Sequence, residues 1–353
     1  MLFRSAGVIG LSCARELAGA GVSVTVLEAA EAAGRSSSAL ANGGIRAQFT
    51  TEVNIAFSRF SIGELETLER TVGGLGFHQT GYLLLAGADA SERTLRDAIE
   101  LQRRLGVETR WLEPAEIASM VPFVRAEGIR GGTFHARDGF LDPAGLVAAL
   151  LAEARTRGAT VLTRAAVSAI EPGFVVRHAN GDLHADAIVN AAGTGARAVA
   201  RLLGSDVPVE PVRRNLAHVM DPSPAGGWVL AYSDPGDPPG WDTSVDPAFL
   251  PALAARLPNR FPSILDLPMD PSQCWAGLYP ETPDHHAIIG EDPTVPGLFH
   301  CVGFGGHGLM HAPAAGRAIG ELVTRGRGES FDLRPLRPSR FVEGDLVAES
   351  AVL

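Results

Sequence analysis

The sequence predicts an α/β protein of two lobes, in which a nucleotide-binding domain is interrupted by a strand-rich α+β lobe. A Gly-rich turn, a helix and a strand follow one another within the first 28 residues, in the order of a βαβ unit. A second strand, Gly-rich turn and helix occupy residues 297–325, and short strands and loops predominate between these ends. We therefore expect the nucleotide-binding domain to comprise residues 1–76, 139–205 and 284–353, and the inserted lobe residues 77–138 and 206–283.

Composition narrows the possible classes of function. The 353 residues carry a net charge of −10, which argues against a nucleic-acid partner. No lysine occurs, so all 30 basic residues are arginine, and chemistry that needs a lysine, such as a pyridoxal Schiff base, is excluded. Cys13, Cys274 and Cys301 are scattered, which fits a reducing compartment. With no apolar run long enough to span a membrane and no targeting segment, we expect a cytoplasmic protein.

Hydrophobic periodicity places the elements along the chain. Helices are predicted over residues 8–17, 52–72, 91–105, 143–158 and 313–325. Strands are predicted over residues 22–28, 80–86, 159–163, 187–193 and 297–303, with a hairpin over 175–185. Residues 106–137 and the chain beyond 330 are predicted as irregular, and 221–246 as loops between short strands.

The opening turn predicts nucleotide binding. Gly7 and Gly10 keep the second and third glycines of a G-x-G-x-x-G fingerprint, whereas Ser5 stands at the first position. Glu28 ends the next strand, where a carboxylate binds ribose hydroxyls, and the helix N-terminus supplies N–H donors to a pyrophosphate. So little chain precedes the turn that we expect the sequence to begin inside the fold, and we interpret residues 1–5 as foreign to it.

Two further stretches carry site chemistry. Residues 34–49 offer hydroxyl donors for phosphates, a Gly43–Gly44 pair that lets backbone approach a flat ring, and the fixed cation of Arg46. An ordinary polar loop, with Arg46 in a structural ion pair, is the alternative. Residues 277–322 contain a strand, a Gly-rich turn over 303–308 and a helix whose N-terminus stabilises negative charge on a bound cofactor.

Together the three stretches resemble the FAD-dependent amine and amino-acid oxidoreductases of the D-amino-acid oxidase and sarcosine oxidase superfamily. The similarity runs from about residue 6 to Phe341 and is greatest to the branch with sarcosine and proline dehydrogenase subunits. It implies a discontinuous Rossmann-like FAD-binding domain with an inserted substrate domain. It also implies oxidation of the C–N bond of an amino acid or N-alkyl amino acid by hydride transfer to flavin N5.

The resemblance implies specific cofactor contacts, which follow the chain in six groups. Those for the pyrophosphate and adenosine ribose are Gly7, Ile9, Gly10 and Glu28, followed by the phosphate contacts Arg35, Ser36 and Ser37. Asn42, Gly43 and Gly44 are expected to pass the flavin ring, and Val167 is expected to contact the adenine. Ala192 and Gly193 form the second turn near the pyrophosphate. The loop at the flavin N1–C2=O edge is Gly305, Gly306, His307, Gly308, Leu309 and Met310.

Departures from the family pattern refine the expectation. Sarcosine oxidases bind flavin covalently through a cysteine at the position of Gly277 in this chain. Cys274 lies three residues earlier, so we expect non-covalent FAD. Met310 stands where such oxidases have a lysine for the substrate carboxylate. The lysine that promotes oxygen reduction is also absent, which favours a dehydrogenase that reduces a quinone, a dye or a partner protein. Near residues 221–228, about twenty residues of the family's substrate sheet are missing.

Arg46, His307 and Tyr279 are the catalytic candidates. Arg46 is expected to contact substrate or flavin, His307 to lie at the flavin edge, and Tyr279 to close over the substrate or pack in the core. Arg46 or a protonated His307 could replace the missing lysine beside the flavin.

Other interpretations stay open. His307 and His311 have a spacing that suits a metal, but no third ligand is evident and the helix is expected to begin only near Pro313, so no metal is predicted. His285 and His286 are expected on the surface. A 2-hydroxy acid dehydrogenase, a non-catalytic FAD-binding assembly factor and a truncated gene product are the alternative functions.

Overall fold

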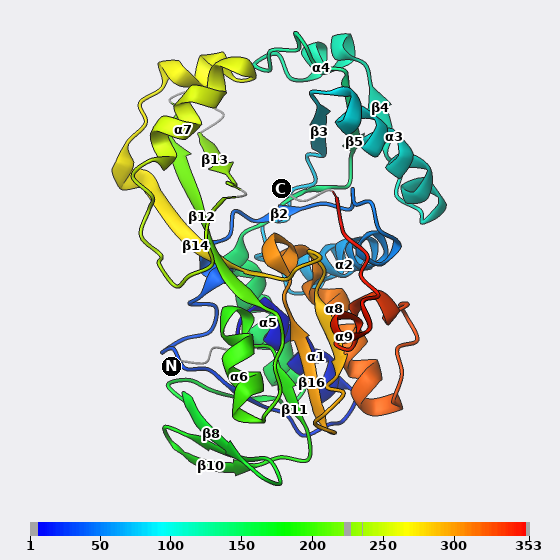
Figure 1. The fold of residues 1–353 in the computed structure, drawn as a ribbon, viewed down its shortest axis with the longest axis vertical. Coiled ribbons are helices and arrows are strands. Elements are labelled where there is room, and N and C mark those ends of the chain that lie inside the picture. The colour runs from blue at the N-terminus through cyan, green and yellow to red at the C-terminus, as the bar shows by residue number, and fades with distance from the viewer. Residues whose placement is uncertain (1–5, 222–226, 235, 351–353) are drawn as a thin grey trace.

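The protein has two halves, with the elements predicted to bind a nucleotide in the lower half of Figure 1 and two arms above them. The computed structural model describes residues 6–221, 227–234 and 236–350. Ser5, with the expectation about residues 1–5, lies outside the described residues, as does most of the 221–228 stretch. The described ends of the chain lie in different places, with the C-terminus close to the centre of the molecule (Figure 1).

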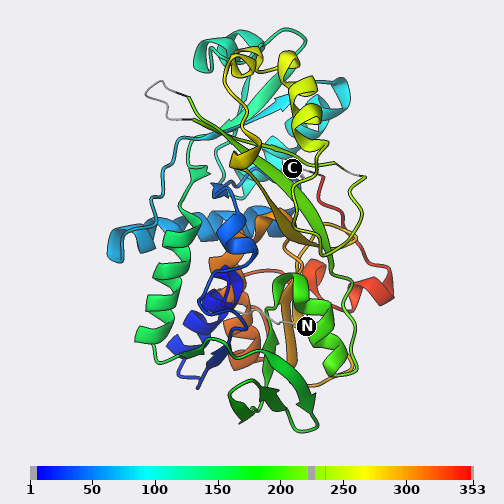
Figure 2. The same ribbon diagram turned by 90° about the vertical axis from the view of Figure 1, so that its left-hand side faces the viewer.

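Segments that are distant in sequence come together in the lower half. Its parallel strand pairs are β1 (Thr25–Leu27) with β7 (Thr160–Leu162), and β11 (Ile188–Asn190) with β16 (Leu298–Val302). β15 (Ile288–Glu291) pairs antiparallel to β16. The helices packed here are α1 (Val8–Gly19), α5 (Pro143–Thr156) and α8 (Gly308–Arg325). Figure 2 shows green α5 standing beside blue α1. The predicted α/β class is confirmed, and the domain boundaries stay a prediction.

Glycine allows α1 and α8 to lie unusually close. A β-carbon at Gly316 of α8 would stand 2.5 Å from the Ser12 carbonyl oxygen of α1. One helix turn later, a β-carbon at Gly320 would meet the Glu16 side chain at 3.2 Å. Because the backbones almost touch, the starts of α1 and α8 hold a fixed position relative to each other.

The C-terminal segment secures the helix that crosses between the halves, α2 (Glu52–Thr71). The buried carboxylate of Glu349 accepts hydrogen bonds from the backbone N–H groups of Thr50 (3.0 Å) and Thr51 (3.2 Å) and from Asn54 Nδ2 (3.1 Å). Its negative charge therefore stabilises the N-terminus of α2. The bidentate pair of Arg340 with Asp284, at 2.8 and 3.0 Å, anchors the same segment nine residues earlier.

The two arms of the upper half each contain a three-stranded sheet. The first has the order β3 (Tyr82–Ala86), β5 (Gly131–His135) and β4 (Arg110–Leu112), with α3 (Asp89–Arg104) and α4 (Pro114–Met120). The second has the order β13 (Trp228–Tyr232), β12 (Glu210–Val219) and β14 (Cys274–Glu281), with α7 (Phe249–Arg256). The arms touch where the rings of Phe123 and Trp228 lie 4.6 Å apart, so they form an arch (Figure 1).

Short elements connect these parts. They are β2 (Gly44–Ile45) paired with β6 (Gly139–Phe140), the sheet of β8 (Val167–Glu171), β9 (Val175–His178) and β10 (Gly181–His184), and the helices α6 (Ala196–Leu202) and α9 (Arg340–Glu343). Among the described residues, no helix combines the length and the apolar character that crossing a membrane requires.

The structure corrects two predicted elements. Residues 106–137 were expected to be irregular, yet they form β4, α4 and β5 around buried Leu112, Ile117 and Ile129. These segments are too short for a clear period, and the strands are held by the pairing of β5 with β3 and of β4 with β5. The helix expected to begin near Pro313 begins at Gly308, and Pro313 lies inside it. The first residues of this helix are rich in glycine, which is a weak helix former, so helix propensity did not predict that the helix begins there.

Candidate active site

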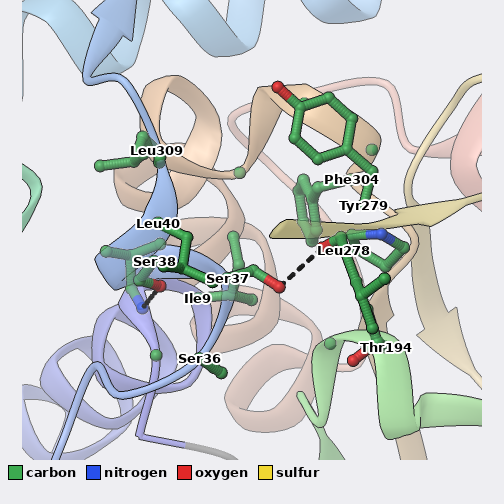
Figure 3. A pocket seen from close by; sticks show the side chains of 18 of the residues that line it. Ile9, Ser36, Ser37, Ser38, Leu40, Thr194, Leu278, Tyr279, Phe304 and Leu309 are labelled. Carbon is green, nitrogen blue, oxygen red and sulfur yellow. Dashed lines mark hydrogen bonds between the residues drawn. The ribbon is translucent and has the colours of Figure 1, made fainter. Parts of the chain in front are cut away.

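A cavity of about 880 Å³ lies between the two halves, at the upper end of the range for small-molecule sites. Figure 3 shows its polar lower part, with Ser36 and Thr194, and its apolar upper part, with Leu40, Leu309, Phe304 and Tyr279. This change of character along its length suits a ligand that has a charged portion and a flat aromatic portion.

The start of α1 forms the polar end. Gly7 is the N-cap residue, and no acidic side chain occurs in the first turn. Ser38 Oγ accepts a hydrogen bond from the Val8 N–H at 3.3 Å, and a β-carbon at Gly7 would lie 3.2 Å from that oxygen. Gly7 and Ile9 line the cavity, so the positive end of the helix faces it.

Hydroxyl side chains connect this end to the upper half. Ser37 Oγ donates to the Leu278 carbonyl oxygen at 2.7 Å (Figure 3), and Trp275 Nε1 donates to the Leu40 carbonyl oxygen at 2.9 Å. These bonds fix the segment after β1 against β14. Ser36 and the exposed side chain of Arg35 also line the cavity, where they can reach a phosphate.

The second helix end lies at the apolar part of the cavity. Gly305 and Gly306 form the turn before α8, and no acidic residue occurs in the first turn of that helix. A β-carbon at Gly306 would lie 2.6 Å from the Tyr279 ring, and Gly305 has a φ of +51°, so both positions require glycine. The α8 dipole therefore presents positive potential to anything flat that fills this part.

Arg46 lies behind the cavity wall, with 1% of its surface exposed. Arg46 Nη1 donates to the Gln48 carbonyl oxygen at 2.6 Å, and its guanidinium lies 4.0 Å from the centre of the Phe49 ring. Arg46 Nη2 lies 3.3 Å from His307 Nε2. Since guanidinium groups only donate, that nitrogen accepts and the proton of the neutral imidazole is on Nδ1. Burial lowers the pKa of Arg46.

His307 and His311 are neutral. Burial, together with the nearby positive Arg46, holds the pKa of His307 well below its usual value, and the same causes lower the pKa of His311 to about 3. The lowered pKa argues against a protonated His307 as the replacement for the missing lysine. Ser58 Oγ lies 2.9 Å from His311 Nε2, so each of the two imidazoles has a partner within the protein. Among the described residues, no group of three or more His, Cys, Asp or Glu side chains is arranged to hold a metal.

Two tyrosines approach the upper part of the cavity from different arms. Tyr279 of β14 lines it, and burial raises the pKa of this phenol. The Tyr82 hydroxyl of β3 points at Gly44, where a β-carbon would lie 3.5 Å away. Arg214 lies 5.6 Å from the Tyr279 ring centre. Hydroxyl donors from both arms therefore face the region above the cavity.

The structure separates the predicted residues into two groups. Those that line the cavity are Gly7, Ile9, Arg35, Ser36, Ser37, Asn42, Gly44, Ala192, Gly193, Tyr279, Gly305, Gly306, Gly308 and Leu309. Those that do not are Gly10, Glu28, Gly43, Arg46, Val167, His307 and Met310.

Some of this second group have other surroundings. Glu28 accepts hydrogen bonds from the N–H groups of Ala6 (2.9 Å) and Ala30 (2.7 Å). A β-carbon at Gly43 would clash with the Leu141 carbonyl oxygen at 2.0 Å, so this glycine serves a tight backbone contact. Val167 lines a second cavity, of about 680 Å³, beside α6.

The expectation for His286 is wrong, since it is buried with 1% of its surface exposed, whereas His285 is exposed. His286 Nε2 lies 3.1 Å from Thr51 Oγ1, and burial lowers its pKa. The sequence gives no periodic pattern around "DHHA" that separates the two side chains.

Cys274 lines the cavity, whereas Gly277 is not among its lining residues, and a β-carbon there would lie 3.3 Å from the Leu40 side chain. Burial raises the pKa of the Cys274 thiol, which keeps it protonated and weakly nucleophilic.

Sequence reasoning missed several lining residues, of which Ser38, Thr194, Trp241 and Trp275 carry polar or aromatic side chains. Ser38 continues the serine run after Arg35 and could have been included with it. Trp241 and Trp275 lie in stretches with no motif, so nothing in the sequence indicated them.

The residues present fit FAD. The cavity offers the N-termini of α1 and α8 to anionic groups, and its Gly7 and Gly306 positions would be filled by a side chain. Its apolar part, with Leu40, Leu309 and Phe304, suits a flavin ring.

Known proteins agree with this fit. The DAO model, described as "FAD dependent oxidoreductase", matches residues 6–322. The chain is 26% identical to FAD-dependent oxidoreductase domain-containing protein 1 of Bos taurus over 98% of this chain and 85% of that protein. It is 29% identical to glycine oxidase of Bacillus licheniformis over 90% of each. The structure of L-proline dehydrogenase from P. horikoshii superposes with a TM-score of 0.91 at 26% identity, over 98% of this chain and 100% of the other.

Proposed function

The chain belongs to the FAD dependent oxidoreductase (DAO) family, and from this membership we propose that it oxidises the C–N bond of an amino acid or N-alkyl amino acid. The product is an imine, which water hydrolyses. Support comes from the similarity to proteins named glycine oxidase and L-proline dehydrogenase, since both names specify a small amino acid as the substrate. The observation that carries the proposal is the cavity that fits FAD, which has Tyr279 in its lining and the Tyr82 hydroxyl directed at Gly44 of the same lining.

FAD, when bound, supplies the acceptor for the substrate's hydride. The chain's own residues then have three tasks. The helix ends of α1 and α8 bind and polarise the cofactor, the arms exclude water, and the side chains above the cavity orient the substrate.

We assign substrate orientation to Tyr82 and Tyr279. Both hydroxyls can donate to a carboxylate, and the raised pKa of Tyr279 keeps it protonated for that role. Arg46 contributes positive potential from behind the wall, where its contacts with Gln48, Phe49 and His307 fix its position. His307, neutral and hydrogen-bonded to Arg46, holds that guanidinium in place and does not take the substrate proton.

Anaerobic titration of the purified yellow protein tests the proposed reaction. Glycine, sarcosine, L-proline, D-proline and L-lactate are added separately, and the loss of oxidised-flavin absorbance is followed. Bleaching by an amino acid supports the proposal, and bleaching by lactate alone supports the 2-hydroxy acid alternative. Flavin that dithionite reduces but no substrate bleaches contradicts an enzymatic role.

We further propose a dehydrogenase with non-covalent FAD. Arg46 is buried away from the cavity surface and burial lowers the pKa of His307, so neither of the two residues expected to replace the lysine offers an exposed cation to stabilise superoxide. Substrate-reduced protein should pass its electrons to a quinone or dye faster than to oxygen, and equal rates would contradict this. After acid precipitation all yellow colour should stay in solution, whereas a yellow pellet would indicate a covalent link, for which Cys274 is the candidate.

A further inference from the structure

A solvent-exposed tryptophan stands where the two cavities meet. Trp241 and Thr194 are the described residues that line both the 880 Å³ and the 680 Å³ cavity. Trp241 nevertheless keeps 57% of its surface exposed. Large aromatic side chains are usually well buried, and an exposed one beside a cavity often marks a binding surface. The ring is therefore placed to gain burial from a ligand that occupies the cavity.

Trp241 belongs to residues 239–246, a stretch outside the helices and strands that we call the cover segment. Its residues face two different partners. Trp241, Thr243 and Val245 line the cavity. Asp242 and Asp246 instead bind Arg213 of β12. One side of the segment thus faces the cofactor site and the other faces its anchor.

Arg213 holds the cover segment by three contacts. Its Nη1 donates to Asp242 Oδ2 at 2.9 Å and to the Ser244 carbonyl oxygen at 3.3 Å, and its Nη2 donates to Asp246 Oδ2 at 3.1 Å. A backbone bond from Gly240 N–H to the Pro211 carbonyl oxygen, at 2.8 Å, fixes the start of the segment. The Asp242 carboxylate is 64% exposed, so salt weakens this anchoring.

We propose that the cover segment retains the cofactor, with the Trp241 ring covering bound FAD at the junction of the two cavities and Arg213 holding the ring there. The α1 N-terminus lines the same cavity, so the ligand that binds this helix end is the ligand beneath Trp241. An aromatic ring at this point excludes water from the cofactor and adds apolar contact. The proposal rests on FAD binding by the family and not on the identity of the amino acid.

The rate at which FAD leaves the diluted holoprotein, followed as the rise in free-flavin fluorescence, tests the proposal. We expect Trp241→Ala to release FAD about tenfold faster and Trp241→Phe within about twofold of the parent, because a phenyl ring preserves most of the aromatic contact. Arg213→Ala should release FAD about threefold faster, because partly exposed ion pairs contribute little. Added salt should accelerate release from the parent but not from Arg213→Ala.

Arg256→Ala is the matched control. Arg256 lies in the same arm and stacks 3.8 Å from the Tyr232 ring, and it is not among the residues that contact the cover segment. Parental release rates in Trp241→Ala overturn the proposal, as does equal acceleration by Arg256→Ala.

A second measurement uses the unaltered protein together with only the conservative variant Trp241→Phe. Acrylamide quenching of tryptophan emission is compared before and after FAD removal, with Trp241→Phe identifying the contribution of Trp241. We expect Trp241 to be accessible to acrylamide only without FAD. Equal accessibility in both states contradicts the proposal, whereas a purified parent that binds no FAD contradicts the cofactor assignment itself.

Discussion

The two ends of the cavity are formed by different kinds of chemical group. At the α1 end, backbone N–H groups, glycines and hydroxyls within residues 7–38 form the surface. At the other end, side chains from separate segments meet: Tyr82 from one arm, Tyr279 from the other, and Arg46 with His307 behind them. The first end suits a ligand part shared by many proteins, and we expect the second end to determine the reaction. The difference implies that the two ends can be disabled independently.

The largest effect is expected at the contact between α1 and α8, which leaves no room for a side chain. Gly316→Ala places a methyl group 2.5 Å from the Ser12 carbonyl oxygen, so α1 and α8 must separate. We expect the free energy of unfolding to fall by about 3 kcal/mol, with weaker FAD binding. Gly63→Ala in α2 is the matched control, since no heavy atom lies within 4 Å of its new methyl group. It should stabilise the protein by about 0.5–1 kcal/mol. Urea unfolding of both variants tests this, and equal midpoints would contradict the close packing.

The next effect concerns the side-chain end. Arg46→Lys keeps the charge but cannot both bind Gln48 and stack on Phe49 while reaching His307. We expect the rate of flavin reduction by the amino acid to fall about 100-fold, with FAD content unchanged. Arg96→Lys, which loses a stacked guanidinium 3.8 Å from the Trp111 ring far from the cavity, should keep parental rates. A parental rate for Arg46→Lys removes Arg46 from the proposed mechanism.

The buried imidazoles make this end sensitive to acid. The pKa of His311 is about 3 in the folded protein, against an ordinary value of 6.5. Below pH 6.5 the unfolded chain therefore binds a proton at this imidazole that the folded protein does not bind. Stability is complete above pH 6.5 and should fall by about 2 kcal/mol between pH 7 and pH 5 from this group. His311→Gln should flatten that fall in urea titrations at the two pH values. Substitution of the exposed His184 by Gln should leave it unchanged. Identical slopes in His311→Gln and the parent would contradict a neutral buried His311.

The smallest effect belongs to a single hydroxyl. Tyr279→Phe should raise KM for the amino acid about tenfold with little change in kcat, as expected for one lost hydrogen bond to an anion. Tyr232→Phe, which removes a hydroxyl bound to Arg256 on the arm's outer side, is the control. An unchanged KM in steady-state assays with an artificial acceptor would show that Tyr279 only packs against Gly306.

The same difference explains how much the sequence predicted. The α1 end depends on spacing, Gly7 to Gly10 and then Glu28, because backbone geometry needs particular residues at fixed intervals. Of the cofactor contacts predicted there, Gly7, Ile9 and residues 35–37 line the cavity, whereas Gly10 and Glu28 do not, and their contacts with FAD stay a prediction. Arg46 was predicted as a fixed cation at the end of the 34–49 stretch, but the sequence did not place it behind the wall. Tyr82 and Trp241 could not be located, because their positions depend on how distant segments pack.

The fold shows a parallel case. Strands of three residues such as β4 have no readable period and exist through pairing with β5, so residues 106–137 were predicted incorrectly as irregular. Long elements with a clear apolar face, such as α2, were predicted to within a residue.

The most direct test of a divided site uses one double variant, Arg46→Lys with Tyr279→Phe. Its FAD content and its anaerobic bleaching by the amino acid that reduces the parent are measured on the same sample. The account predicts parental FAD content with bleaching slowed at least about 100-fold. Parallel loss of FAD and of bleaching, or parental bleaching with full FAD content, would contradict the claim that backbone binds the cofactor while these side chains orient the substrate.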